Sequence, residues 1–142
     1  GGYMAAMAVT YGAGYFQYAI SEYPVVDWAL YDSHYTERYM DRPQDNPEGY
    51  RAASVLTYLD RYQSKGESML YLLHGLMDDN VHVQNTFQLV DSLQKLEKQF
   101  RLMVFPNERH GWFVKLKYTA KAKNDFMNEC LNLNSHSLKT TE

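Results

Sequence analysis

Three stretches of the chain carry the hydrophobic pattern of β-strands. Residues 15–23 are rich in aromatic and β-branched side chains and are followed by Pro24, which a strand rarely passes. Residues 68–75 form a nearly continuous apolar run that closes on a glycine, which is typical of a strand buried on both faces of a parallel sheet. Residues 100–105 follow as another predicted strand. The pattern therefore predicts three strands.

The segments around these strands have the pattern of helices. Small residues and good helix formers fill the start of the chain, with no helix breaker before Gly12. Residues 83–99 carry apolar side chains at helical intervals opposite a charged face, which indicates an amphipathic helix with Phe87, Val90, Leu93 and Leu96 on its apolar side. We predict helices over residues 2–9, 25–40, 50–59, 83–99 and 115–133, with a loop over residues 42–49.

The predicted helix over residues 25–40 carries a stripe of four aromatic side chains. Trp28, Tyr31, Tyr35 and Tyr39 are spaced by three, four and four residues, which places them on one face of a helix. Such a stripe either packs in the core or lines a pocket, and the spacing alone leaves both alternatives open.

The order of the elements predicts the fold class. Strands that alternate with helices are joined by right-handed crossovers and form a parallel sheet. Three strands are few for a sheet that is buried on both faces. We therefore expect an α/β fold that is part of a larger domain, with further strands preceding this chain.

Composition and charge exclude several classes of protein. The 142 residues suit one domain at most, and 45% of them are hydrophobic, which is enough for a packed core. With 14 Lys and Arg against 17 Asp and Glu, no basic face indicates binding to nucleic acid. No apolar run approaches the ~18–20 residues of a membrane span, and the N-terminus lacks the basic flank of a signal peptide.

Polar clusters follow the second and third predicted strands, where parallel α/β sheets carry their functional groups. The first contains Asp78, and the second contains His110. An acid on one loop and a histidine on the next match the later members of a Ser…Asp…His hydrolase triad. The nucleophile of such a triad precedes them on a sharp strand-to-helix turn.

Other interpretations of these residues remain open from the pattern alone. An acid after a strand is often only a helix cap, a role that Asp79 or Asn80 can fill here, and a loop histidine such as His110 is often only solvated. His74, Asp78 and His82 are spaced by four and would form a metal-binding stripe on a helix, but Gly75 and the preceding strand argue against a helix there. We expect no metal site.

A longer series of motifs resembles a known family. The series is Gly1-Gly2-Tyr3, residues 35–40, His74-Gly75, residues 78–82 and His110-Gly111. In this order and spacing it resembles the catalytic domain of the dipeptidyl peptidase IV and prolyl oligopeptidase family. The resemblance covers residues 1–133 and implies the C-terminal half of an α/β-hydrolase domain, with residues 134–142 as a polar tail. It also implies that the chain starts two residues after the serine of the motif G-W-S-Y-G-G-Y.

The resemblance implies roles for individual residues. Asp78 matches the acid of the triad, and His110 matches its base. An apolar pocket for the penultimate proline is matched by Val25, Trp28, Tyr31, Tyr35 and Val81, and a polar contact to the substrate by Asn80. No cofactor is implied. Tyr18 stands where dipeptidyl peptidase IV has a cysteine bonded to the one that matches Cys130, so that disulfide is not expected.

The resemblance also implies an activity. We expect a serine exopeptidase that releases N-terminal Xaa-Pro dipeptides, or tripeptides, from peptides with a penultimate proline or alanine. Its other partners would be the upstream part of the same polypeptide, including a β-propeller, and a second copy in a homodimer. Such enzymes are periplasmic, secreted or membrane-tethered. The residues given are expected to be inactive alone, and the alternative is a non-catalytic interaction module whose nucleophile has been replaced.

Overall fold

The structure is a computed structural model that describes residues 1–66 and 68–137. It divides into two compact units, one of residues 1–110 and one that begins at residue 111. The chain of the first unit carries both loops on which the sequence predicts functional residues.

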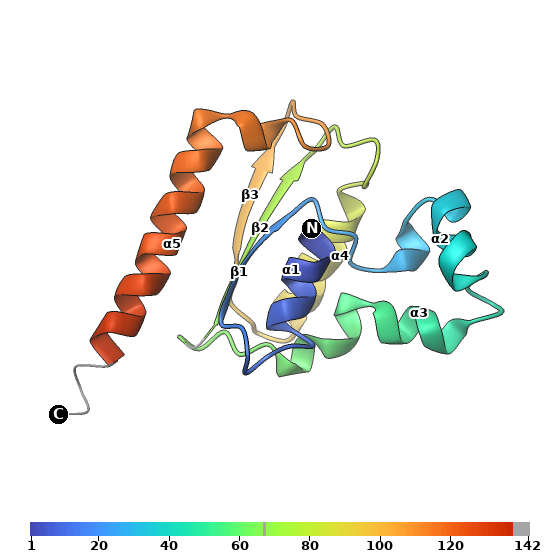
Figure 1. Ribbon diagram of the computed structural model, residues 1–142, viewed down its shortest axis with the longest axis horizontal. Helices are drawn as coiled ribbons and strands as arrows, with labels where there is room; N and C mark the ends of the chain where they lie inside the picture. The colour runs from blue at the N-terminus through green and yellow to red at the C-terminus, as the bar shows by residue number, and fades with distance from the viewer. Residues whose placement is uncertain (67, 138–142) are drawn as a thin grey trace. The chain divides into compact units, whose positions relative to one another are not determined.

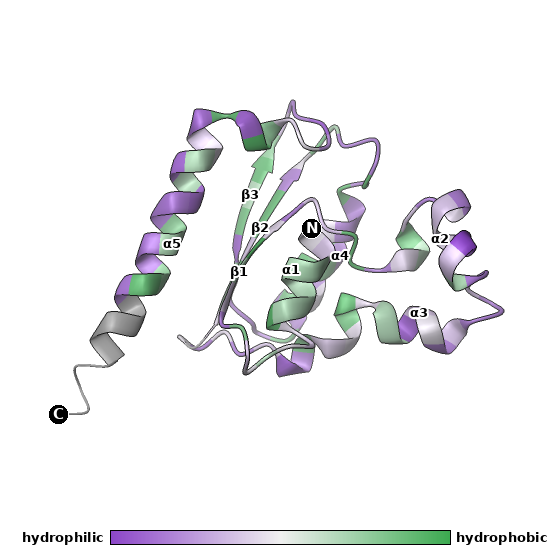
Figure 2. Cartoon of the chain, in the orientation of Figure 1, coloured by the Kyte–Doolittle hydropathy of each residue, from purple (hydrophilic) through white to green (hydrophobic). Residues whose placement is uncertain are grey.

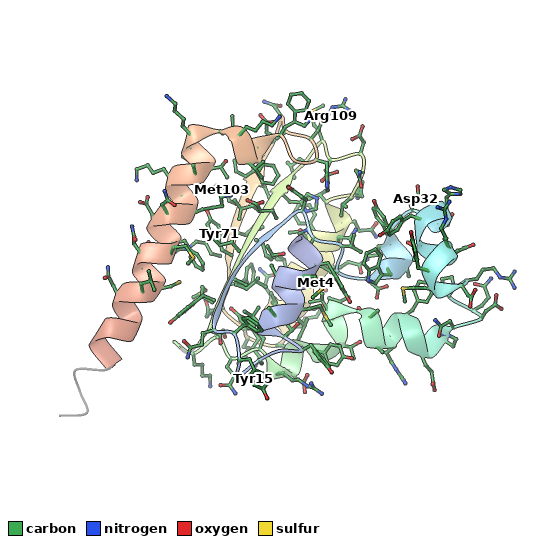
Figure 3. All side chains as sticks on the ribbon, in the orientation of Figure 1. Met4, Tyr15, Asp32, Tyr71, Met103 and Arg109 are labelled. Atoms are coloured by element: carbon green, nitrogen blue, oxygen red, sulfur yellow. The ribbon has the colours of Figure 1, made fainter. Side chains whose placement is uncertain are left out.

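The first unit contains a three-stranded parallel sheet, with the helices of that unit on one side of it (Figure 1). Its strands lie in the order β1 (Tyr18–Glu22), β2 (Met69–Gly75) and β3 (Arg101–Phe105), with β2 in the middle. Figure 3 labels Tyr71 on β2 and Met103 on β3, and the Tyr71 hydroxyl donates a hydrogen bond to the Met103 sulfur. The three predicted strands, their parallel direction and the α/β fold class are confirmed.

One hydrophobic core joins this sheet to the helices of the first unit. Helix α1 (Gly2–Val9), which Figure 2 shows in green tones, packs closely on β1. A Cβ atom at Gly2 would collide with the carbonyl oxygen of Glu22, so glycine permits this approach. The buried core contains Ala6, Val9, Ala19, Val26, Val55, Leu59, Tyr62, Leu70, Leu72, Leu89 and Leu93.

Helix α4 (Gln84–Lys95) is amphipathic as predicted, but a different face is buried. Phe87 and Leu96 are each 46% exposed, whereas Thr86, Leu89 and Leu93 are buried. The Thr86 hydroxyl bonds to the buried ring of His74, so this polar side chain is satisfied inside the core. That partner, which the apolar pattern could not reveal, explains why the polar Thr86 lies on the buried face.

The predicted continuous helix over residues 25–40 is wrong. The segment forms a short 3₁₀ turn, η1 (Trp28–Leu30), followed by helix α2 (Ser33–Met40). Asp27 accepts a hydrogen bond from the backbone of η1, and Asp32, labelled in Figure 3, accepts one from the Tyr35 amide. Each aspartate therefore caps its own helix, and the backbone is extended at Tyr31, between η1 and α2.

The predicted helix over residues 50–59 is also divided. Helix α3 (Pro47–Ala53) begins earlier, because Asn46 caps it and Pro47 suits its first turn. The 3₁₀ helix η2 (Val55–Arg61) follows after Ser54. The Ser54 hydroxyl donates a hydrogen bond to Asp27. The backbone of Ser54 is extended, so α3 ends before this residue.

The second unit consists of the 3₁₀ turn η3 (Phe113–Lys115) and helix α5 (Lys117–Ser137). Figure 2 shows apolar and polar bands alternating along α5. The helix runs four residues past the predicted end at residue 133, and the rest of the predicted polar tail, residues 138–142, lies outside the described residues. Within the described ranges, no helix combines the length and apolar character needed to cross a membrane.

Candidate active site

The two predicted functional loops leave the sheet side by side. Strands β2 and β3 are paired through their last residues, Gly75 with Phe105, so the loops that follow them start at the same edge. The Leu76 amide donates to the carbonyl of Phe105, and the Met77 amide donates to that of Glu108. A Cβ atom at Gly75 would collide with the same Glu108 carbonyl, so the glycine lets the loops approach one another.

Asp78 and His110 meet at this edge of the sheet. The distance between Nδ1 of His110 and Oδ2 of Asp78 is 2.8 Å. The other carboxylate oxygen, Oδ1, accepts hydrogen bonds from the amides of Asn80 and Val81 at 3.0 and 2.9 Å. Since these contacts all present donors to Asp78, they suit an ionised carboxylate. Nδ1 of His110 then carries the proton, and Nε2 is the ring nitrogen that can accept another.

The environments of the two side chains differ. The Asp78 side chain is fully buried, whereas that of His110 is 32% exposed. A buried carboxylate with three donors keeps a fixed orientation, and the partly exposed imidazole can meet a reacting group. The pair is therefore suited to moving a proton at Nε2.

His74 forms a further, fully buried contact with this loop. Its Nε2 lies 2.8 Å from the carbonyl oxygen of Val81 and 3.3 Å from Oδ2 of Asp78. Both neighbours are acceptors, so Nε2 carries the proton, and Nδ1 accepts from Thr86 at 2.7 Å. Burial lowers the pKa of His74 and outweighs the hydrogen bond to Val81 and the charge of Asp78, which act in the opposite direction.

At pH 6.5 we expect His74 to be neutral with its proton on Nε2, because its pKa lies below the ordinary value of 6.5. The neutral form of His74 stabilises the folded protein at pH values above the pKa of this histidine in the unfolded chain. This stabilisation is lost as the pH falls through the lower pKa of His74 in the folded protein. ¹⁵N–¹H correlation spectra of ¹⁵N-histidine-labelled protein report the protonation of each ring nitrogen. An imidazolium at pH 6.5, or a proton on Nδ1 alone, would contradict this assignment.

His74, Asp78 and His82 do not form a metal-binding stripe. His74 lies within β2, while Asp78 and His82 lie in the loop that follows this strand. The exposed His82 ring accepts from the amide of Gln84. In the described ranges 1–66 and 68–137, no group of three His, Cys, Asp or Glu side chains is arranged to hold a metal ion.

A cavity of about 290 Å³ opens beside His110. Its volume is close to the lower end of the range for ligand pockets, about 300–1,000 Å³. Every predicted substrate-binding residue lies on its wall. The lining consists of Gly1, Gly2, Tyr3, Tyr23, Val25, Trp28, Tyr31, Tyr35, Asn80, Val81 and His110.

The aromatic residues of this wall contact one another although the predicted helix is interrupted. Trp28 and Tyr35 are stacked with ring centroids 6.3 Å apart, and Tyr31 meets both edge to face. The Tyr31 hydroxyl donates to Oδ1 of Asn80 at 2.8 Å. Burial raises the pKa of Tyr31, with a smaller contribution from Asp32, so the hydroxyl keeps its proton at neutral pH. The wall therefore combines apolar rings with a few fixed polar groups.

Sequence reasoning missed two residues of this site, His74 and Tyr23. The sequence places His74 in a possible metal stripe and in the family motif His74-Gly75, but a histidine within a buried apolar strand also requires polar partners. The hydrophobic pattern places Tyr23 only at the end of a strand. Its ring lies against that of His110, with the centroids 4.1 Å apart, and no pattern in the sequence indicates that contact.

Comparison with known proteins identifies the family of this chain. The chain matches the prolyl oligopeptidase family over residues 1–134. It is 44% identical over 113 residues to a probable dipeptidyl-aminopeptidase B of Neurospora crassa, and 40% identical over 111 residues to human dipeptidyl peptidase 8. Each match covers 78% of this chain and 12% of the relative, so the chain spans about an eighth of the length of these curated proteins.

A solved structure agrees with this match. The crystal structure of Porphyromonas gingivalis dipeptidyl peptidase 4 superimposes with a TM-score of 0.75 at 31% sequence identity, covering 94% of this chain and 18% of that one. The parallel sheet with its flanking helices is accordingly part of an α/β-hydrolase fold. Because the family match extends over residues 1–134, the chain belongs to the prolyl oligopeptidase family.

Proposed function

We propose that this chain supplies the acid, the base and the proline pocket of a serine exopeptidase that removes Xaa-Pro dipeptides from the N-termini of peptides. The observation that carries the proposal is the 2.8 Å contact between Asp78 and His110 beside the aromatic cavity. The relatives are named dipeptidyl-aminopeptidase and dipeptidyl peptidase, which supports release of dipeptides over tripeptides.

In the proposed reaction the nucleophile is a serine two residues before Gly1. Nε2 of His110 takes the proton of the serine hydroxyl as its oxygen attacks the scissile carbonyl, and Asp78 stabilises the resulting imidazolium. His110 then gives the proton to the leaving amine, which departs. In the second half, His110 takes a proton from water as the water attacks the acyl-enzyme, and returns that proton to the serine oxygen as the acyl group leaves. The Asp78 contact keeps the proton on Nδ1, so Nε2 is free to act as the base.

The cavity wall accounts for the proposed preference for proline. A proline ring is compact and apolar, and Trp28, Tyr31 and Tyr35 can enclose it between their rings. Longer side chains would be rejected by collision with these rings rather than by a missing hydrogen bond. Alanine should fit with fewer contacts. Asn80, which accepts from Tyr31, would hold a polar group of the substrate.

The remaining parts of such an enzyme would come from the upstream polypeptide. Acyl transfer needs the serine and oxyanion donors within hydrogen-bond reach of the base. We therefore propose that residues 1–142 alone hydrolyse no peptide at a useful rate, and that the upstream hydrolase segment and β-propeller complete the site. A homodimer of the whole protein is part of the same proposal.

An assay of the whole protein separates this proposal from the alternative of a non-catalytic interaction module. The protein should release chromophore from a Gly-Pro anilide, and a serine-directed fluorophosphonate should inactivate it stoichiometrically. Residues 1–142 assayed in parallel should do neither. Failure of the whole protein to hydrolyse the anilide or to react with the probe would favour the non-catalytic module.

Replacing Tyr35 with alanine should lower kcat/KM for Gly-Pro substrates by about tenfold, because the enlarged cavity makes fewer contacts with the proline ring of the substrate. The ratio of kcat/KM for Gly-Pro substrates to that for Gly-Leu substrates should fall as well, because the larger cavity no longer excludes the leucine side chain. Tyr39→Ala is the matched control, since Tyr39 belongs to the same aromatic stripe but does not line this cavity. Kinetics with both substrates measure the ratio. An unchanged ratio in Tyr35→Ala would assign Tyr35 to packing alone.

A further inference from the structure

Tyr23 is in direct contact with the imidazole of His110. The ring centroids are 4.1 Å apart at an interplanar angle of 51°, closer than the ~4.5–7 Å usual for aromatic pairs. Tyr23 also lines the cavity together with Gly1 and Gly2. It therefore lies on one side of the base, while Asp78 contacts the base through Nδ1.

The backbone of Tyr23 is in an unfavourable conformation. Its φ angle is +39°, in the left-handed region that bulky residues rarely adopt. The next residue is Pro24, which favours an extended conformation in the residue before it. The Tyr23 amide donates to the carbonyl of Leu73 at 2.7 Å, so the surrounding sheet holds the residue there. An unfavourable backbone conformation of this kind persists where the surrounding contacts hold the residue in it, and such residues are often found at functional sites.

The hydrogen bond to Asp78 restrains Nδ1 of His110 at 2.8 Å. Hydrogen bonds tolerate a range of distances and angles, so small rotations about the Cα–Cβ and Cβ–Cγ bonds of His110 remain and change the direction of Nε2. A flat ring with its centroid at 4.1 Å limits these rotations. We propose that Tyr23 is a positioning residue for His110, in which a strained backbone holds the phenol ring against the imidazole and so aims Nε2 at the nucleophile.

The charge state of Tyr23 agrees with this role. Burial raises the pKa of its hydroxyl, with smaller contributions from the charges of Glu22 and Asp78, so the phenol is neutral at working pH. A neutral aromatic ring tolerates the imidazolium that forms during the reaction, since the face of the ring attracts cations. The contact can therefore persist in both protonation states of His110.

This inference rests on the proposed peptidase function, and its first test is kinetic. In the whole protein, Tyr23→Leu should lower kcat for a Gly-Pro anilide by about tenfold to a hundredfold, the scale expected for a misaligned catalytic group, while KM changes less than threefold. Tyr23→Phe keeps the ring and should retain kcat within about twofold of the wild type. Equal kcat values in the Leu and Phe variants would overturn the proposal.

A second test does not depend on turnover. The proton between Nδ1 of His110 and Asp78 should give a downfield NMR resonance that is sharp in the wild type and in Tyr23→Phe. It should be broadened by exchange with water in Tyr23→Leu. If the wild type cleaves no substrate but these spectra are observed, the proposed function fails and the positioning role stands. A resonance equally sharp in Tyr23→Leu would overturn that role whatever the activity.

The strain itself is tested by two variants that both lack the ring. Glycine adopts φ of +39° without penalty, whereas alanine does not, so Tyr23→Gly should unfold at a higher temperature than Tyr23→Ala. Both should have the low kcat of Tyr23→Leu. The reverse order of melting temperatures would show that position 23 stores no strain, and would overturn the inference that the fold forces this ring into place.

Discussion

Replacing His110 with alanine is expected to abolish peptidase turnover of the whole protein, lowering kcat by a factor on the order of 10⁶. Without an imidazole no group can take the serine proton, and a serine hydroxyl is a weak nucleophile at neutral pH. Binding of the substrate should change little, because the aromatic rings of the cavity remain. Steady-state kinetics on a Gly-Pro anilide, together with the KM or inhibitor affinity, measure both effects.

His34→Ala is the matched control for this experiment. His34 is an exposed histidine on α2 whose ring contacts Arg38, and it does not line the cavity. Its removal should leave kcat within about twofold of the wild type. A His110→Ala variant that folds and keeps more than a tenth of the wild-type kcat would show that another group is the base.

Replacing Asp78 with asparagine should lower kcat on the order of 10⁴-fold. The amide can present a donor to His110, which would favour the tautomer with the proton on Nε2 and remove the acceptor that the serine needs. The charge that stabilises the imidazolium is lost as well. The downfield proton of His110 should disappear from the NMR spectrum together with the activity.

The neighbouring acid provides the control for Asp78→Asn. The Asp79 side chain is 68% exposed and pairs with Arg109 at the surface, a contact worth little in water. Asp79→Asn should therefore retain kcat within about threefold of the wild type. If the two substitutions had equal effects, the assignment of the acid to Asp78 would be wrong.

The sequence was a good guide to the strands and to the edge of the sheet that carries the site. Residues 68–75 are apolar because β2 is central, and such burial leaves a clear hydrophobic pattern. Since adjacent parallel strands end at the same edge, the loops of Asp78 and His110 could be placed together before any distance was known. The spacing of Trp28, Tyr31 and Tyr35 likewise indicated a common surface.

The parts that could not be predicted depend on single local contacts. The helix over residues 25–40 is divided because Asp27 and Asp32 act as caps. The sequence pattern alone does not distinguish an aspartate that caps a helix from one that faces solvent. The buried face of α4 depends on the bond between Thr86 and His74. The Tyr23 contact depends on a left-handed φ angle, for which a tyrosine before a proline gives no signal.

We propose above that Asp78 and His110 activate a serine that lies next to this chain in the polypeptide. Labelling of the whole protein with a fluorophosphonate, followed by peptide mass spectrometry, tests it most directly. We expect one modified serine, two residues before Gly1, with labelling of that serine slowed at least a hundredfold in His110→Ala. A label on another residue, or a rate unaffected by loss of His110, would contradict it.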